Sequence, residues 1–305
     1  MKLIGENIHI ISKRTKEAIE NQDKDYILNY VNKMLAANVD YIDLNIGPAR
    51  KTQGTMKWLA SIVREVSDIP LSFDTTNPAE MRSGLEFVKN PNDCIINSVS
   101  ADQNRLDALL PLAKEFQSNL IALTLSDETG IPKEADGRLE IAFNILEQTM
   151  QYEIDNSKIF FDPLVLPIPV AQEQAIESLN AIRMFKESFD PPVLTTVGLS
   201  NVSNGAPKEN RPLINRVFMV LAMGCGLDSA IVDGFDEELI RVHSMIENQT
   251  PQKDYDELYI KLFDMMQNFG ELEEIDYDKN NPNQTNIFKT AQILLNKNIY
   301  SHNYL

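Results

Sequence analysis

The sequence has little of what several common classes of protein require. Its 305 residues include two cysteines, Cys94 and Cys225, which argues against a disulfide framework and fits a reducing compartment. No apolar run is long enough to span a bilayer, and the opening MKLIGENIHI lacks the apolar core of a secretion signal. We therefore expect a soluble cytoplasmic protein that makes no contact with a membrane.

Positive charge is also scarce. Lysine and arginine number 28 against 45 acidic residues, which gives a net charge of -17. Proteins that bind nucleic acid use cationic side chains to displace the counterions of phosphate, so this balance argues against nucleic acid as a partner. The three histidines, His9, His243 and His302, are far apart, and no constellation typical of zinc or of a covalent nucleophile is present. The sequence predicts no metal site.

Short apolar segments alternate with helical patterns along most of the chain. Eight strand and helix pairs with short connections predict right-handed crossovers and one closed parallel (β/α)8 barrel, a TIM barrel. An open doubly wound sheet is the alternative, and the lack of a glycine-rich phosphate fingerprint after the first strand weakens it. The predicted strands are residues 2–10, 41–45, 69–74, 94–97, 119–124, 159–162, 193–197 and 229–232.

The alternating pattern lapses after residue 246. Residues 249–285 are rich in Asp, Glu, Asn and Tyr, although 255–269 could form a short amphipathic helix, and a final helix is expected at 287–297. We interpret 249–285 as an acidic surface insertion before the C-terminal helix of a single domain that spans residues 1–305. A solvated excursion is favoured over a dedicated docking element.

Acidic and amide side chains recur at the carboxyl ends of the predicted strands, where barrels of this kind build their active sites. Each one taken alone can equally be a helix N-cap worth about 1 kcal/mol, so the recurrence carries the prediction. Carboxylates accept paired hydrogen bonds from a guanidine-like edge, and amides serve mixed edges, which suits the 2-amino-4-oxopyrimidine edge of pterins or purines. The candidates are Glu6, Asn7, Asp43, Asn45, Asp74, Asn97, Ser126, Asp127, Asp162, Ser200, Asn201 and Asp233.

The seventh strand end, VLTTVGLSN at residues 193–201, is the most specific of these segments. Its β-branched and aliphatic start predicts a buried strand, and Gly198 is expected to let the backbone turn. Asn201 follows the carboxyl end of this strand. A neutral amide that both donates and accepts can steady a heteroatom whose protonation changes during a reaction.

Several motifs resemble those of one family. The matching stretches are IGE near Gly5, YIDLNIGPA, FDTTN, INS, LTLSDETGIPK, FDPLVLP, VGLSNVS, NRPLINR, GLDSAIVD, DEELI and AQILLNKNIY. Together they extend over nearly all of the chain except residues 249–285. With them the chain resembles the methyltetrahydrofolate:corrinoid protein methyltransferases, within the pterin-binding barrels that include dihydropteroate synthase. The resemblance implies movement of the N5 methyl group between methyltetrahydrofolate and the cobalt of a corrinoid (cobalamin) on a partner protein. It also implies a homodimer.

The resemblance also implies roles for individual residues. Asp74, Asn97 and Asp162 are implied to hold the pterin ring, and Asn201 to hydrogen-bond near N5, while Asp43 and Asn45 lie in matching motifs. An amine nitrogen leaves poorly unless it is protonated or strongly hydrogen-bonded as its bond to the methyl group breaks, which gives Asn201 its catalytic role. The corrinoid is expected on a separate protein, because the chain has no Asp-x-His-x-x-Gly pattern.

Other functions stay open at this point. Dihydropteroate synthase uses a Ser-Arg pair where this sequence has Ser200-Asn201, and the missing basic residue argues against pyrophosphate chemistry. A purine-handling barrel has no motif in its favour, whereas a non-catalytic folate-binding protein fits the same residues. The direction of methyl transfer and the proton source for N5 are not predicted.

Overall fold

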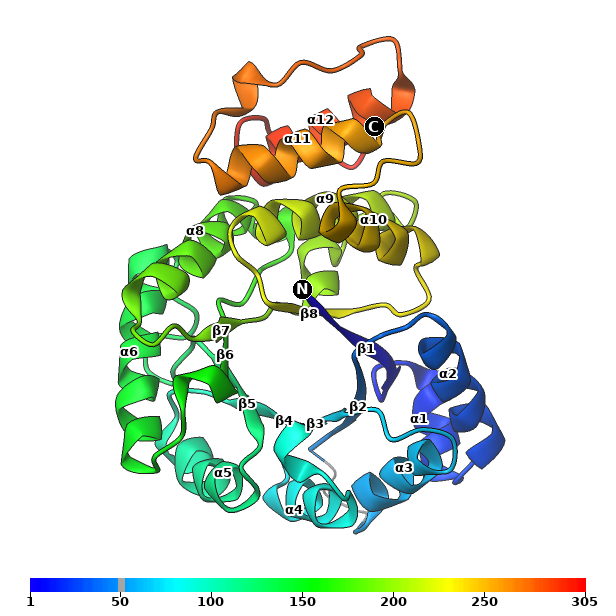
Figure 1. Ribbon diagram of the computed structural model, residues 1–305, viewed down its shortest axis with the longest axis vertical. Coiled ribbons are helices and arrows are strands. Elements are labelled where there is room, and N and C mark those ends of the chain that lie inside the picture. Colours follow the sequence, from blue (N-terminus) through cyan, green and yellow to red (C-terminus); the bar gives the residue numbers. More distant parts are fainter. Residues whose placement is uncertain (49–52) are drawn as a thin grey trace.

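The strands form a parallel barrel, seen end-on in Figure 1. The computed structural model describes residues 1–48 and 53–305, and within them neighbouring strands pair in the order β7-β6-β5-β4-β3-β2-β1-β8. The eight strands of this part of the chain are β1 (Lys2–His9), β2 (Tyr41–Gly47), β3 (Leu71–Thr75), β4 (Ile95–Val99), β5 (Asn119–Leu123), β6 (Ile159–Asp162), β7 (Leu194–Thr195) and β8 (Ser229–Val232). The predicted TIM barrel is confirmed.

The barrel closes between β7 and β8. The Ile231 backbone N–H donates to Val197 O at 2.9 Å, and Gly198 forms a parallel bridge with Ile231. β7 is shorter than the predicted strand, because beyond Thr196 the backbone pairs with β8 instead of β6. This closure brings the segment after β7 next to the ends of β1 and β8.

Helices cover the outside of the barrel. Asn77, Asp102 and Asp236 cap three of them by accepting backbone N–H groups, which stabilises the helix start. The surrounding helices are α1 (Lys13–Glu20), α2 (Lys24–Ala36), α3 (Thr55–Arg64), α4 (Pro78–Phe87), α5 (Gln103–Phe116), α6 (Ala135–Gln151), α7 (Ile168–Ala171), α8 (Glu173–Ser188), α9 (Arg211–Gly224) and α10 (Glu237–Asn248).

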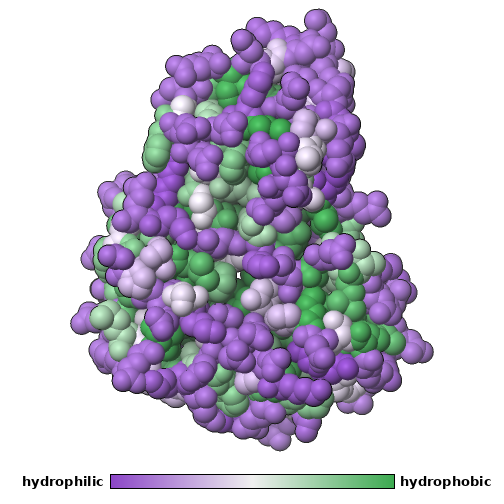
Figure 2. All heavy atoms as spheres, in the orientation of Figure 1, coloured by the Kyte–Doolittle hydropathy of each residue, from purple (hydrophilic) through white to green (hydrophobic). Residues whose placement is uncertain are grey.

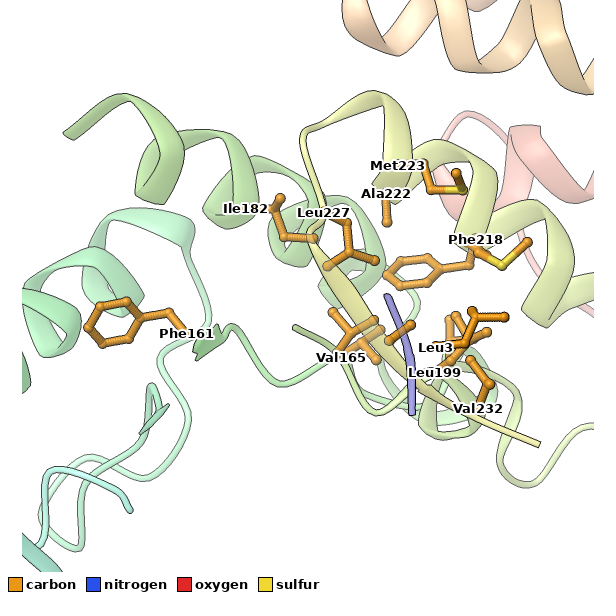
Figure 3. Close-up of a cluster of buried hydrophobic side chains, with 14 of the residues drawn as sticks. Leu3, Phe161, Val165, Ile182, Leu199, Phe218, Ala222, Met223, Leu227 and Val232 are labelled. Carbon is orange, nitrogen blue, oxygen red and sulfur yellow. The ribbon is translucent and has the colours of Figure 1, made fainter. Parts of the chain in front are cut away.

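The apolar core has two parts. The larger part lies between the strands and the helices, and Figure 3 shows Ile182 of α8 and Phe218 of α9 in it, near Leu227. The smaller part fills the inside of the barrel at the amino ends of its strands. That plug consists of Ile4, Ile95, Ile121 and Phe160, with Tyr41, Leu123, Leu194 and Ile231 packed against it.

The plug determines where the polar layer lies. Side chains two residues apart on a strand point to the same face, so the residue two positions after a plug residue also points into the barrel. Asp43 and then Asn45 follow Tyr41 on β2, and Asp162 follows Phe160 on β6. Apolar packing therefore forms the base, and acids and amides form the next layer toward the carboxyl ends.

The C-terminal helices form a second layer outside α9 and α10 (Figure 1). They are α11 (Asp256–Gln267) and α12 (Pro282–Leu294), joined through the short 3₁₀ helix η4 (Leu272–Glu274). The interpretation of residues 249–285 as a solvated excursion is wrong for α11, because its apolar face is buried and covers α9. Whether the segment is an insertion relative to shorter relatives stays a prediction. The buried side chains of α11 include Leu258, Tyr259, Leu262, Met265 and Met266.

The outer surface is mostly polar. Figure 2 shows hydrophilic side chains over most of the visible face, with apolar side chains between them. None of the helices in residues 1–48 and 53–305 has the length and apolar character needed to cross a membrane.

Candidate active site

The carboxyl ends of the strands open into a cavity of about 830 Å³. All six residues singled out from the sequence for a site role line it, and so do four more of the strand-end candidates. The six are Asp43, Asn45, Asp74, Asn97, Asp162 and Asn201, and the four are Glu6, Asn7, Ser200 and Asp233. Within the described chain, these ten residues come from seven of the eight strand ends, and the barrel brings them to one cavity.

Two strand-end candidates do not line the cavity. Ser126 and Asp127 lie beyond the end of β5, where Ser126 bridges to Gly130 and its hydroxyl bonds with that of Thr129 at 2.8 Å. This turn carries both residues away from the barrel interior. Leu123, the last residue of β5, lines the cavity there instead.

Hydrogen bonds between side chains of β2, β3 and β4 hold acids and amides of the cavity floor. Asn97 Nδ2 donates to Asp43 Oδ1 at 3.3 Å, and the Asn45 side-chain amide donates to the Asp74 carboxyl group. Asp43 and Asn97 are buried, with 2% and 7% of their surface exposed. The amides thus orient the carboxyl groups before any ligand binds.

The carboxyl group of Asp162 is fixed by backbone. Its Oδ1 accepts from the Leu164 N–H at 2.7 Å, and the side chain is buried. The alternative of a helix N-cap is wrong for Asp162, and also for Asp43 and Asp74, because none of the three caps a helix in the structure. Helix capping therefore does not account for the positions of these three acids.

Asn201 lies on η3 (Leu199–Ser203), exposed at the mouth of the cavity. The chain turns into η3 at Gly198, but the φ of -76° at this residue is one that any residue adopts, so the turn itself does not require glycine. A Cβ atom at this position would lie 2.8 Å from Asn201 Nδ2, so any larger residue would displace the Asn201 amide. Gly198 thus makes room for the Asn201 amide against the backbone.

Burial raises the pKa of the acids in the cavity. It raises the pKa of Glu6 to about 7 and those of Asp74 and Asp162 to about 6. Burial, together with the nearby Asp74, also raises the pKa of Asp43 well above its usual value. The charged form loses hydration in such a place, so these groups can hold a proton near neutral pH and donate hydrogen bonds as well as accept them.

Glu6 is linked to the segment that carries Asn201. The Ser200 hydroxyl donates to the Glu6 carboxyl group, across 194 positions of sequence. The Asn7 amide, next in the chain, donates to Asp233 Oδ1 at 2.6 Å and ties the end of β1 to that of β8. An acid whose pKa lies close to neutrality is thereby held one residue from the amide expected to act on N5.

Comparison with known proteins agrees with this arrangement. The family model of pterin binding enzymes matches residues 12–233, most of the barrel. The chain belongs to the pterin-binding enzyme family. The floor of acids and amides described above is therefore the candidate pterin site of a family member.

Two curated relatives have names that describe their reactions. The chain is 30% identical over 243 residues to the methylcorrinoid:tetrahydrofolate methyltransferase of Eubacterium limosum, covering 79% of this chain and 88% of that protein. It is 33% identical over 232 residues to the methionine synthase of Mycobacterium tuberculosis, covering 72% of this chain but 19% of the much longer synthase.

Solved structures of dihydropteroate synthases share the fold. The Yersinia pestis enzyme superposes with a TM-score of 0.58 at 16% identity, covering 81% of this chain and 92% of that one. The Xanthomonas albilineans enzyme gives 0.60 at 16% identity, with 82% and 93% covered. At 16% identity this similarity shows a shared fold and does not indicate a shared reaction.

Several lining residues of this pterin-binding barrel were not predicted as site residues. Lys208, Arg211 and Asn215 line the cavity from the segment that leads into α9 and from its first two turns, and His9 lines it from β1. Asn215 Oδ1 and His9 Nδ1 are buried with no hydrogen-bond partner in the described part of the chain. The motif NRPLINR contains Arg211 and Asn215, but nothing in it indicates that they face the strand ends.

No cluster of three or more His, Cys, Asp or Glu side chains suited to a metal ion occurs within residues 1–48 and 53–305. The floor of the cavity contains hydrogen-bonded carboxyl and amide pairs. Such pairs suit an organic ligand with several N–H and ring-nitrogen groups.

Proposed function

We propose that this protein is a methyltransferase that moves the N5 methyl group between methyltetrahydrofolate and the cobalt of a corrinoid carried by a partner protein. The observation that carries the proposal is the convergence of the six predicted acids and amides on one cavity. The name of the Eubacterium limosum relative supports it, since this chain covers 88% of that protein.

The floor of the cavity is suited to the pterin ring. Asp74, Asn97 and Asp162 would bind the 2-amino-4-oxo edge and the adjoining ring nitrogens, with Asp43 and Asn45 orienting them. Because burial raises the pKa of Asp74 and Asp162 to about 6, each can bind a ring donor as a carboxylate or a ring acceptor as an acid.

The mouth of the cavity is suited to the chemistry at N5. The nitrogen must gain a proton or a strong hydrogen bond as the methyl group leaves for cobalt, and the Asn201 amide can supply that contact. Glu6, with its pKa raised to about 7, lies beside Ser200 and is our candidate for the proton source that the sequence did not reveal. In the reverse direction the same groups would remove the proton.

A corrinoid on a partner protein would approach this mouth, where Asn201 is exposed. The partner, a homodimeric state and a cytoplasmic location stay predictions drawn from the sequence. The likeness to dihydropteroate synthases concerns the fold alone and does not favour their reaction.

The decisive experiment is a spectroscopic assay that follows the oxidation and methylation state of the corrinoid. Purified protein is mixed anaerobically with reduced corrinoid and methyltetrahydrofolate, and separately with methylcorrinoid and tetrahydrofolate, with and without candidate carrier proteins. We expect enzyme-dependent transfer in at least one direction. Tight binding of methyltetrahydrofolate with no transfer in any arm would refute the proposal and favour a folate-binding protein.

A further inference from the structure

Charge is unevenly distributed around the cavity. Carboxyl groups occupy its floor, and Asp233 and Asp236 line it on the β8 side. Among the described residues that line it, Lys208 and Arg211 are the only lysine and arginine side chains. Both belong to the segment between η3 and the start of α9, so the positive charge lies on one side of the mouth.

Lys208 and Arg211, the two cations at the rim of the cavity, have no anionic partners in the described structure. The Lys208 side chain is exposed, and within residues 1–48 and 53–305 its ammonium group makes no hydrogen bond or ion pair. Arg211 donates through Nε to Ala206 O at 2.8 Å, which leaves the two terminal nitrogens of its guanidinium without a partner in the described structure. In a chain with a net charge of -17, two cations without anionic partners that line the same cavity point to an anionic ligand.

The two acids that line the cavity after β8 already have hydrogen-bond or ion-pair partners. Asp233 Oδ1 accepts from Asn7 at 2.6 Å and from the Phe235 N–H at 2.9 Å. Asp236 caps α10 and lies 3.7 Å from an Arg216 nitrogen. Neither acid forms an ion pair with Lys208 or Arg211 in the described structure, so both cations can still bind an anion that enters the cavity.

We propose that Lys208 and Arg211 bind the carboxylates of the γ-linked glutamate tail of the folate, so that the protein prefers polyglutamylated folates. This inference rests on the proposed function. A reduced folate carries an uncharged pteridine at one end and carboxylates at the other, which matches a floor of hydrogen-bonding acids and a cationic rim. Arginine can bind a carboxylate through two parallel hydrogen bonds, and lysine contributes a mobile point charge that can reach successive glutamates.

The test is a set of binding titrations under anaerobic conditions. The probes are a tail-less tetrahydropterin and methyltetrahydrofolate in its monoglutamate, triglutamate and pentaglutamate forms. The variants are Lys208→Gln, Arg211→Gln and the pair together, with Arg211→Lys as the variant that retains charge. Lys279→Gln serves as the matched control, because it removes an exposed lysine charge from residues 270–281, which do not line the cavity.

We expect wild-type affinity to rise with each added glutamate and each neutralised cation to lower the affinity for polyglutamates about two- to fivefold, the range of exposed ion pairs. The affinity for tail-less pterin should stay the same in all variants. Added salt should reduce the difference between wild type and the double variant, because it screens exposed charges. Lys279→Gln should match the wild type.

The outcomes separate this inference from the proposed function. Equal wild-type affinity for the monoglutamate and pentaglutamate, or an unchanged double variant, would overturn the inference while pterin binding stands. Failure of the wild type to bind any of the probes would instead refute the proposed function. The inference about the glutamate tail would also be overturned if inorganic pyrophosphate bound through the same cations and more tightly than a free γ-glutamate tripeptide. Lys208→Gln changes an exposed side chain, so it tests the inference even if Arg211→Gln proves unstable.

Discussion

Glu6 gives the sharpest test of how burial controls this site. Burial raises its pKa from 4.5 to about 7, against the opposing effect of the Ser200 hydrogen bond. The folded state thus binds this proton more tightly than the unfolded state. The contribution of Glu6 to stability is therefore fully present below pH 4.5 and is lost as the pH rises through about 7. Glu6→Gln keeps the size and the hydrogen-bond acceptor but stays neutral at every pH.

The size of the effect follows from the shift. At about 1.4 kcal/mol per pKa unit, a rise from 4.5 to about 7 corresponds to roughly 3 kcal/mol. Because Glu6 is half-buried and lines an open cavity, solvent screening reduces this, and we expect about 1–2 kcal/mol. Glu6→Gln should therefore exceed the wild type in unfolding free energy by that amount near pH ~8 and lose this advantage near pH ~4.5.

Urea unfolding of the ligand-free protein at several pH values, followed by circular dichroism, measures the difference. Glu257→Gln, an exposed acid on α11, is the control and should shift stability little at any pH. A stability difference between Glu6→Gln and the wild type that is independent of pH, or that favours the wild type near pH ~8, would refute the reasoning about burial.

Four further predictions concern the site and the outer helical layer. Asn201→Ala should slow methyl transfer about 100-fold with little change in folate affinity, because the amide acts on N5 in the transition state; stopped-flow rates near wild type would remove it from the chemistry. Asp162→Ala should weaken pterin binding roughly 10- to 100-fold in a titration and change the rate of the bound complex less. Gly224→Ala should lower the unfolding free energy by about 1–3 kcal/mol, because its Cβ would lie 2.6 Å from a backbone oxygen of α11; an unchanged melting temperature would contradict this. Asp256→Ala should cost about 1–3 kcal/mol and should speed amide exchange in α11, since it removes the buried partner of Arg241, which keeps Glu238, and the acceptor of two backbone N–H groups.

The strand ends were predictable because their geometry is periodic. On β2 the alternation from Tyr41 to Asp43 to Asn45 already determines which side chains share a face, and a closed parallel barrel gathers such faces at one end. The prediction failed at Ser126 and Asp127 for the same reason. They lie past the end of β5, where a turn and not the strand sets the direction of the side chains.

The rim of the cavity was not predictable in this way. Lys208 and Arg211 reach it through the path of the segment after η3, which no periodic pattern encodes. The sequence indicated an amphipathic helix near residues 255–269. Which surface this helix covers depends on α9, because α11 packs against the outer face of α9 in the folded protein.

The sequence by itself determined the barrel, its eight strand ends in the described chain and the acids and amides that follow them, because these depend on short-range alternation. Only the tertiary structure decided the pKa values of those acids and which side chains lie next to them. Glu6 and Ser200 are 194 positions apart and meet because β1 pairs with β8 and β8 with the end of β7. The raised pKa of Glu6 comes from the water that the closed barrel excludes, and that depends on every element around it.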